Sequence, residues 1–169
     1  NHLATSKEDI LAASRDLIKE NGWAAVSIRA VASRCSVSAG TIYNYYESKA
    51  DLLSDTIESI WHEIFFHPED EQVFHDVESC ISWIYERLEY GNRQFPGFFS
   101  LHSFGFMRDE KTSGKKRMMK TWGHILNGLC EVLENDPKVR ADVFDQEFTE
   151  KKFADILFSL ILVSMIRQD

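Results

Sequence analysis

The sequence lacks any long apolar run. No stretch approaches the roughly 18 consecutive apolar residues that suggest a membrane span. The first residues, 1 to 7, are polar and do not resemble a secretory signal. These absences argue against membrane-spanning and secreted proteins. We therefore expect a protein of the cytoplasm without a membrane partner.

Cysteine is scarce and its spacing is uninformative. Cys35, Cys80 and Cys130 are an odd number, lie far apart and lack metal-ligand or redox spacing. They predict buried thiols in a reducing compartment, and a redox-sensing cysteine is the alternative. The adjacent His62 and Glu63 would face apart on a helix, which does not suit a metal site. We expect no metal and no cofactor.

Proline occurs only at positions 68, 96 and 137, and the apolar residues between turn signals have helical spacing. This pattern predicts an all-α protein. Ser6, Ser27, Ser38 and Ser48 are expected to cap four helices that begin within the first fifty residues. Further helices are expected at roughly 70–91, 94–107, 112–135 and 146–167. The last of them is apolar nearly all round, which predicts burial on every side and a partner subunit as its cover.

Positive charge is also in short supply, because the net charge is −8. Residues 1–50 carry six Lys and Arg against five Asp and Glu, which leaves 13 basic against 22 acidic residues in the remainder. Such asymmetry indicates two modules with different partners. We predict an N-terminal domain over residues 1–50 and a C-terminal domain over residues 51–169.

The most informative segment is residues 27–49, SIRAVASRCSVSAGTIYNYYESK. It predicts two short helices joined by a turn at Ser36-Val37, which is typical of a helix-turn-helix. Ile42 and Tyr46 lie four apart and are expected to face the core. The opposite face is small and polar, suited to phosphates and base edges. Its members are Ser38, Thr41 and Tyr45, flanked by Ala39, Tyr43 and Asn44.

Lys49 adds a second signal. It occupies the first turn of a predicted helix, where the helix dipole disfavours a positive charge. A phosphate across this helix end would meet both the free amides and the ammonium group. A solvated surface lysine is the alternative interpretation.

This segment resembles the N-terminal domain of the tetracycline repressor (TetR) family of bacterial regulators. Residues 6–60 carry the resemblance, with Ser36 where the family usually has Gly and Asn44 where many members have His. The matching positions are Ser27, Arg29, Val31, Ala32, Val37, Ser38, Gly40, Ile42, Tyr43, Tyr45, Tyr46, Lys49 and Leu52. The resemblance implies a three-helix DNA-binding domain joined to a helical domain for effector binding and dimerisation.

The resemblance also implies which residues meet double-stranded operator DNA. We expect the backbone phosphates to be bound by Tyr43, Tyr45 and Lys49. Arg29, Ala39 and Asn44 are the candidates for base readout, since Arg suits guanine and Asn suits adenine. The full expected set is Ser27, Arg29, Ser38, Ala39, Gly40, Thr41, Tyr43, Asn44, Tyr45 and Lys49. We expect a homodimer on a roughly two-fold symmetric operator.

The C-terminal part is rich in aromatic residues, especially in QFPGFFSLHSFGF at 94–106. Such material suits a pocket for a small hydrophobic or aromatic effector, and a plain hydrophobic core is the alternative for any one residue. The candidate pocket residues are Trp61, Phe65, Tyr85, Phe98, Phe99, His102, Phe104, Met107 and Trp122. Trp83 and His124 belong to the same aromatic and polar material.

Two other classes of protein compete with this interpretation. No nucleophile elbow, glycine-rich phosphate loop or paired-carboxylate motif is present, so we do not expect an enzyme. A helical adaptor that has lost DNA binding is compatible with the nearly neutral N-terminal half. The sequence favours a ligand-responsive transcription regulator, a repressor that an effector releases from its operator.

Overall fold

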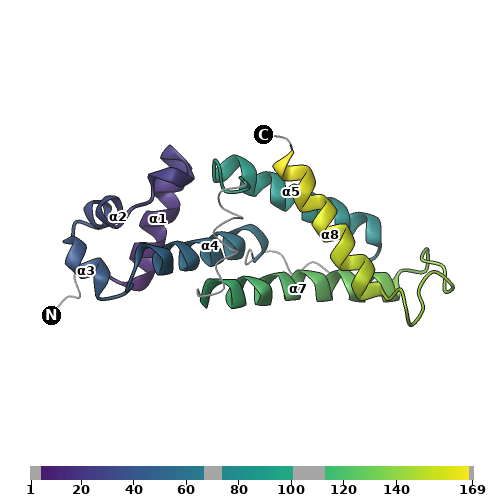
Figure 1. Cartoon of the computed structure of the whole chain (residues 1–169). Helices are drawn as coiled ribbons and strands as arrows, with labels where there is room; N and C mark the ends of the chain where they lie inside the picture. Colours follow the sequence, from purple (N-terminus) through teal and green to yellow (C-terminus); the bar gives the residue numbers. More distant parts are fainter. Residues whose placement is uncertain (1–4, 67–73, 101–112, 168–169) are drawn as a thin grey trace.

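The computed structural model describes residues 5–66, 74–100 and 113–167 (Figure 1). Within these ranges the regular structure is helical, without a strand, which confirms the all-α prediction. The elements are α1 (Lys7–Asn21), the 3-10 turn η1 (Trp23–Ala25), α2 (Ile28–Arg34), α3 (Ala39–Tyr43), α4 (Lys49–Phe65), α5 (Val77–Gln94), α7 (Ser113–Asn135) and α8 (Glu150–Ile166).

Serine side chains begin the first four α-helices, as predicted. Ser6 and Asp9 form a reciprocal capping box at the start of α1. The hydroxyls of Ser27, Ser38 and Ser48 each accept a hydrogen bond from the amide three residues later, at the starts of α2, α3 and α4. Each such cap contributes about 1 kcal/mol to helix stability. These caps explain how such short helices form at fixed positions.

Ser36 makes the turn between α2 and α3. Its φ is 57°, the only positive φ of a non-glycine residue in the part of the chain that the structure describes. The turn closes on the end of α2, because the Val37 amide donates to the Ala32 carbonyl at 3.0 Å. A serine therefore holds the left-handed conformation that glycine adopts at lower cost.

Helix α4 joins the N-terminal helices to the rest of the molecule (Figure 1). It packs against α1 on one side and against α7 on the other. Two ion pairs fix it along α1: the Lys7 ammonium lies 2.6 Å from Asp55, and the Lys19 ammonium lies 2.7 Å from Glu63. The predicted domain boundary at residue 50 falls inside the first turn of this continuous helix, and the division stays a prediction.

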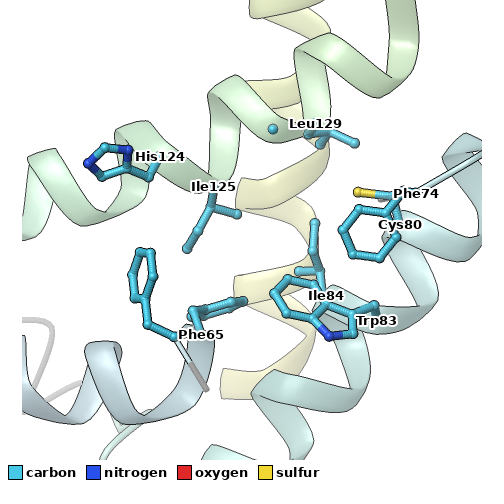
Figure 2. A pocket seen from close by; sticks show the side chains of 10 residues that line it. Phe65, Phe74, Cys80, Trp83, Ile84, His124, Ile125 and Leu129 are labelled. Carbon is cyan, nitrogen blue, oxygen red and sulfur yellow. The ribbon is translucent and has the colours of Figure 1, made fainter. Parts of the chain in front are cut away.

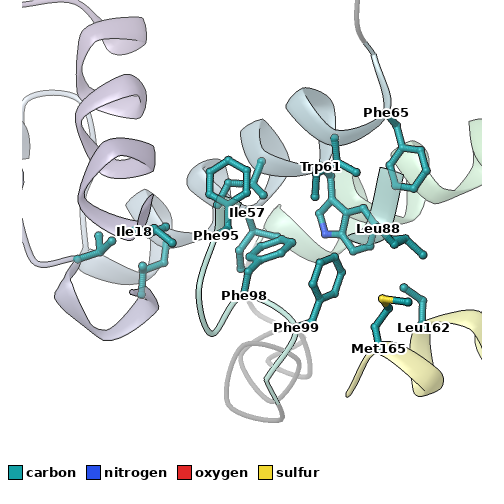
Figure 3. Close-up of a cluster of buried hydrophobic side chains, with 14 of the residues drawn as sticks. Ile18, Ile57, Trp61, Phe65, Leu88, Phe95, Phe98, Phe99, Leu162 and Met165 are labelled. Atoms are coloured by element: carbon teal, nitrogen blue, oxygen red, sulfur yellow. The ribbon is translucent and has the colours of Figure 1, made fainter. Parts of the chain in front are cut away.

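Trp61 of α4 lies at the centre of the C-terminal core and is 1% exposed (Figure 3). Its indole ring lies 5.6–5.8 Å, centroid to centroid, from the rings of Phe65, Phe98, Phe99 and Trp122. Edge-to-face aromatic pairs at this distance add stability beyond the area that they bury. The core therefore ties α4 to α7 and to the turn that follows α5.

Helix α5 begins at Val77 rather than near residue 70, which corrects the predicted start. Asp76 caps it, and the buried Asp136 carboxylate accepts a hydrogen bond from the Val77 amide at 2.8 Å. The Lys138 ammonium lies 3.0 Å from Asp76. These long-range contacts join the start of α5 to the segment that follows α7, and periodicity alone does not reveal them.

The predicted helix at 94–107 is wrong for its first residues. Helix α5 continues to Gln94, and residues 95–100 form turns. Gly97 has a φ of 78°, and the Pro96 carbonyl accepts a hydrogen bond from the Trp23 amide at 2.9 Å. Proline and a left-handed glycine interrupt the helix here in spite of the apolar spacing. Residues 101–107 lie outside the described ranges.

Helix α8 begins at Glu150 and is capped by Thr149, four residues later than predicted. Its sides are not all buried within one chain, so the predicted cover by a partner subunit stays a prediction. Ile156, Leu160 and Val163 are 49%, 62% and 48% exposed. They lie on one face because their spacing is four and three residues. In the described ranges, no helix is long and apolar enough to cross a membrane.

Candidate nucleic-acid interface and apolar pocket

Helix α3 presents a polar face to solvent and an apolar face to the core. Ile42 is fully buried and Tyr46 is 4% exposed, as predicted for the inner face. On the other side Tyr43 is 54% exposed. The remaining exposed or half-exposed residues of this segment are Ser38, Ala39, Gly40, Thr41 and Asn44. The predicted recognition face is therefore accessible to a partner.

Some predicted contact residues already have bonds within the chain. Ser27 accepts the Ala30 amide at the start of α2, and the hydroxyls of Ser38 and Thr41 lie 3.1 Å apart. The half-buried Tyr45 donates its hydroxyl proton to the Thr5 carbonyl at 2.7 Å. A tyrosine hydroxyl has one proton to donate. A phosphate contact through Tyr45 would therefore replace the bond to Thr5.

The six basic residues of the first fifty divide into two groups. Four of them form ion pairs with acidic side chains. The pairs are Lys7–Asp55, Arg15–Glu8, Arg15–Glu63, Lys19–Glu63 and Arg34–Glu20. Arg29 and Lys49 are exposed and make no hydrogen bond or ion pair through their side chains with any residue that the structure describes. The two cations without a partner among the described residues are the two that the sequence predicts to contact DNA.

Arg29 and Lys49 lie at the beginnings of helices. Arg29 is the second residue of α2, after the Ser27 cap, and Lys49 is the first residue of α4, after the Ser48 cap. Both positions place a cation beside amides that are not used within the helix. An anion at the start of α4 would meet these amides as well as the Lys49 ammonium.

A pocket of about 170 Å³ lies among α4, α5 and α7 (Figure 2). Its walls are aromatic and aliphatic. The lining residues are Phe65, Phe66, Phe74, Cys80, Trp83, Ile84, His124, Ile125, Gly128 and Leu129. The rings of Phe65 and Phe74 lie 5.8 and 5.3 Å from the ring of Trp83. Such a lining favours an uncharged apolar occupant, because burying an unpaired charge is costly.

Few polar groups reach this pocket. Burial raises the pKa of the Cys80 thiol to about 11, so the thiol is neutral at physiological pH. His124 is exposed and its ring meets the ring of the exposed Phe66 at 6.3 Å, on the side where the pocket faces solvent. No group of three or more His, Cys, Asp or Glu side chains within the described residues could hold a metal ion.

The pocket coincides only in part with the residues predicted for it. Phe65 lines it, whereas the buried Trp61, Phe98 and Phe99 pack in the core beside it. Tyr85 and Trp122 are half-buried and are not part of this lining. His102, Phe104 and Met107 lie outside the described residues. The role of this predicted set in binding stays a prediction.

Sequence reasoning did not single out most of the actual lining. Trp83 and His124 belong to the aromatic and polar material of the C-terminal part but are not among the predicted pocket residues. Nothing in the sequence distinguishes Phe66, Phe74 and the aliphatic lining residues from residues of a hydrophobic core. The stripe at 124, 125, 128 and 129 on α7 is the one available sign, because its spacing places a glycine between bulky residues on one helix face.

The family of the N-terminal segment follows from its sequence. The model of the family described as "Bacterial regulatory proteins, tetR family" matches residues 10–56. The N-terminal segment of this chain belongs to the TetR family. The match covers α1 to α3 and the first part of α4, which are the elements that hold the exposed polar face. The predicted family is therefore confirmed.

Two curated relatives match the same segment of this chain. The HTH-type transcriptional regulator UidR of Escherichia coli K12 is 38% identical over 48 residues, which is 28% of this chain and 24% of UidR. The HTH-type transcriptional repressor KstR of Rhodococcus jostii RHA1 is 45% identical over 47 residues, which is 28% of this chain and 22% of KstR. The matched segment thus spans about a quarter of each relative.

Solved structures resemble the whole fold at low sequence identity. A TetR transcriptional regulator from Streptomyces coelicolor has a TM-score of 0.69 at 16% identity, covering 97% of this chain and 72% of that chain. FadR from Bacillus subtilis, in complex with stearoyl-CoA, has a TM-score of 0.65 at 20% identity, covering 96% of this chain and 86% of FadR. BioQ with its double-stranded DNA operator has a TM-score of 0.59 at 16% identity, covering 97% of this chain and 86% of BioQ. The TetR architecture therefore extends through the C-terminal helices.

Proposed function

We propose that this TetR-family regulator binds operator DNA through α3 and the starts of α2 and α4. The observation that carries the proposal is the division of the N-terminal cations. Arg29 and Lys49 make no ion pair with the described residues, whereas the other four basic residues are neutralised within the chain. Two exposed cations beside an exposed polar helix make a surface that suits a polyanion.

Within this surface each side chain has a proposed role. Lys49 and the exposed Tyr43 contact phosphates, and Tyr45 does so only by giving up its bond to Thr5. Arg29 and Asn44 contact base edges in the major groove, where their donors match guanine and adenine respectively. Among the solved structures of similar fold, the BioQ complex with its operator supports this use of the fold.

We further propose that a small apolar effector in the pocket lowers the affinity for the operator, so that the regulator acts as a repressor. The aromatic and aliphatic lining supports an apolar occupant. The complex of FadR with stearoyl-CoA is one instance of a similar fold holding a ligand. By linkage, an effector that binds better to the protein off DNA must weaken operator binding by the same factor.

The proposed regulator acts as a homodimer whose subunits meet along α8. The exposed apolar face of Ile156, Leu160 and Val163 supports this interface. Two subunits related by a two-fold axis would present two copies of α3 to a symmetric operator.

The test is fluorescence anisotropy with labelled DNA from immediately upstream of the gene, titrated at several salt concentrations against random competitor DNA. Arg29→Gln is expected to lower operator affinity by roughly 1–3 kcal/mol and to relax sequence preference. Lys49→Gln is expected to weaken all sequences alike and to reduce the salt slope by about one.

Arg34→Gln is the matched control. It removes one exposed positive charge from the same helix as Arg29, but this charge is already paired with Glu20. The proposal requires near-normal operator affinity in the control. Equal losses in Arg29→Gln and Arg34→Gln would mean that net charge matters rather than the assigned surface. If the unaltered protein binds the upstream DNA no more tightly than random DNA, the result would support the helical adaptor instead.

A further inference from the structure

We infer that the pocket among α4, α5 and α7 accepts a single uncharged aromatic ring, and that Gly128 sets this size limit. The inference deepens the proposed function, since it names the chemical class of the effector and rests on the pocket being the effector site. It concerns the part of the effector that enters the pocket. Polar parts of the molecule would stay beside His124, where the lining meets solvent.

The size of the pocket is the first argument. Its volume is about 170 Å³. An engineered apolar cavity of about 150 Å³ in another protein holds benzene, so a volume of this order fits one ring. A second fused ring exceeds this volume and would project toward solvent beside His124, where fewer wall atoms contact it.

The lining is the second argument. Four of its side chains are aromatic, and Phe65 and Trp83 already meet edge to face, with centroids 5.8 Å apart and planes at 63°. A ligand ring between such walls gains the same kind of contact. Cys80 is buried and, with Ile84, offers no charge to a carboxylate or an ammonium group. The lining therefore favours a ring without charge.

Gly128 is the third argument. It lies on α7 one turn after His124 and Ile125 and directly before Leu129, all of which line the same pocket. A Cβ atom built at Gly128 meets no other atom within 4 Å. Packing within the described chain therefore does not require glycine here, although glycine weakens a helix relative to alanine. The absent side chain leaves room on the pocket face of α7.

Gly123 provides a control on the same helix. A Cβ atom built there also meets nothing within 4 Å. Gly123 is not part of the pocket lining, and Met119, Lys120 and Asn127, which share its face by helical spacing, are exposed. A side chain added at either glycine has space, but only the one at Gly128 would occupy the pocket.

The experiment measures toluene binding by isothermal titration calorimetry and by the shift in thermal midpoint, for the unaltered protein, Gly128→Leu and Gly123→Leu. Toluene is expected to bind the unaltered protein and Gly123→Leu equally, and Gly128→Leu about tenfold or more weakly. Naphthalene is expected to bind the unaltered protein more weakly than toluene. Gly128→Ala is the milder variant, expected to fold normally and to give a smaller loss.

Three results would overturn the inference. One is equal toluene affinity in Gly128→Leu and Gly123→Leu, with Gly128→Ala also unchanged. A second is the absence of toluene binding to the unaltered protein. The third is tighter binding of octanoate than of toluene, which would assign the pocket to an aliphatic chain. Operator anisotropy on the same preparations separates this inference from the proposed function, because DNA binding that persists without toluene binding removes only the inference.

Discussion

The backbone amide of Trp23 donates a hydrogen bond of 2.9 Å to the carbonyl oxygen of Pro96. This bond joins the turn after α1 to the turn after α5. The Trp23 ring also meets the ring of Phe98 at 6.1 Å, and Phe98 meets Trp61 at 5.8 Å. Trp61 in turn stacks on Phe65, which lines the pocket. A continuous series of aromatic contacts thus joins the pocket wall to the N-terminal helices.

Gly97→Ala tests the junction between Trp23 and Pro96. Gly97 has a φ of 78°, and an added Cβ would lie 3.4 Å from the Trp23 Cβ. A side chain in this conformation costs about 1–2 kcal/mol, so urea unfolding is expected to show a loss of that order. Gly123→Ala, in a helix and with open space, is expected to gain up to about 1 kcal/mol. Equal free energies of unfolding for the two variants would contradict this account.

Ser36→Gly is expected to stabilise the protein. The φ of 57° at Ser36 suits glycine, and relief of the left-handed strain contributes about 1 kcal/mol, reduced by the greater freedom of glycine in the unfolded chain. The measurement is the urea midpoint at constant m-value. Ser33→Gly, in the helical part of the same segment, serves as the control and should destabilise. A lower midpoint in Ser36→Gly would show that the serine is not strained.

Leu160→Glu is expected to convert the proposed dimer into a monomer. Leu160 is 62% exposed on the apolar face of α8, and a buried unpaired carboxylate would be costly at an interface. Light scattering coupled to size-exclusion chromatography measures the mass. Met119→Glu is the matched control, because Met119 is 61% exposed but belongs to another helix, α7. A dimer that survives in Leu160→Glu would place the interface elsewhere.

Asp76→Asn is expected to lower the free energy of unfolding at neutral pH, and to lower it by less at acid pH. Hydrogen bonds from the Ser79 hydroxyl and amide, and then from the Lys138 ammonium, hold the pKa of Asp76 well below its usual range. A lowered folded-state pKa gives stability that is fully present above the unfolded value of about 3.9, and this stability is lost as pH falls through the folded value.

Urea titrations of Asp76→Asn and the unaltered protein between neutral pH and pH 3 check this expectation. Asparagine caps a helix as well as aspartate does, so the variant isolates the charge. The difference in the free energy of unfolding should narrow below about pH 4. A difference that stays constant over the whole range would assign the effect to the cap rather than to the charge.

The N-terminal helices could be predicted in detail because their signals are local. Ser27 and Ser38 sit next to the helices that they cap, and the turn at Ser36 lies between them. The C-terminal boundaries were harder to predict for the opposite reason. The start of α5 depends on Asp136, a residue 59 positions further along the chain. Such a contact leaves no trace in periodicity.

The pocket was the least predictable feature. Its walls come from three helices and the residues beside their ends. An aromatic residue in the core, such as Trp61, cannot be told in the sequence from one in the lining, such as Phe65. The apolar spacing at 94–100 predicts a helix, but Pro96 and Gly97 interrupt it and these residues form turns. At this position the helix-breaking residues are a better guide to the structure than the apolar periodicity.

The internal pairing of four N-terminal cations has a consequence for how such a protein would find its operator. Affinity for random DNA grows with the number of phosphates that a protein neutralises, through release of bound counterions. Among the described residues of the N-terminal surface, Arg29 and Lys49 are the basic residues without an ion pair, and the whole chain has a net charge of −8. Such a surface would release few counterions. Encounters with random sequence would be brief, and the search would proceed by repeated collisions from solution rather than by long slides along the chromosome.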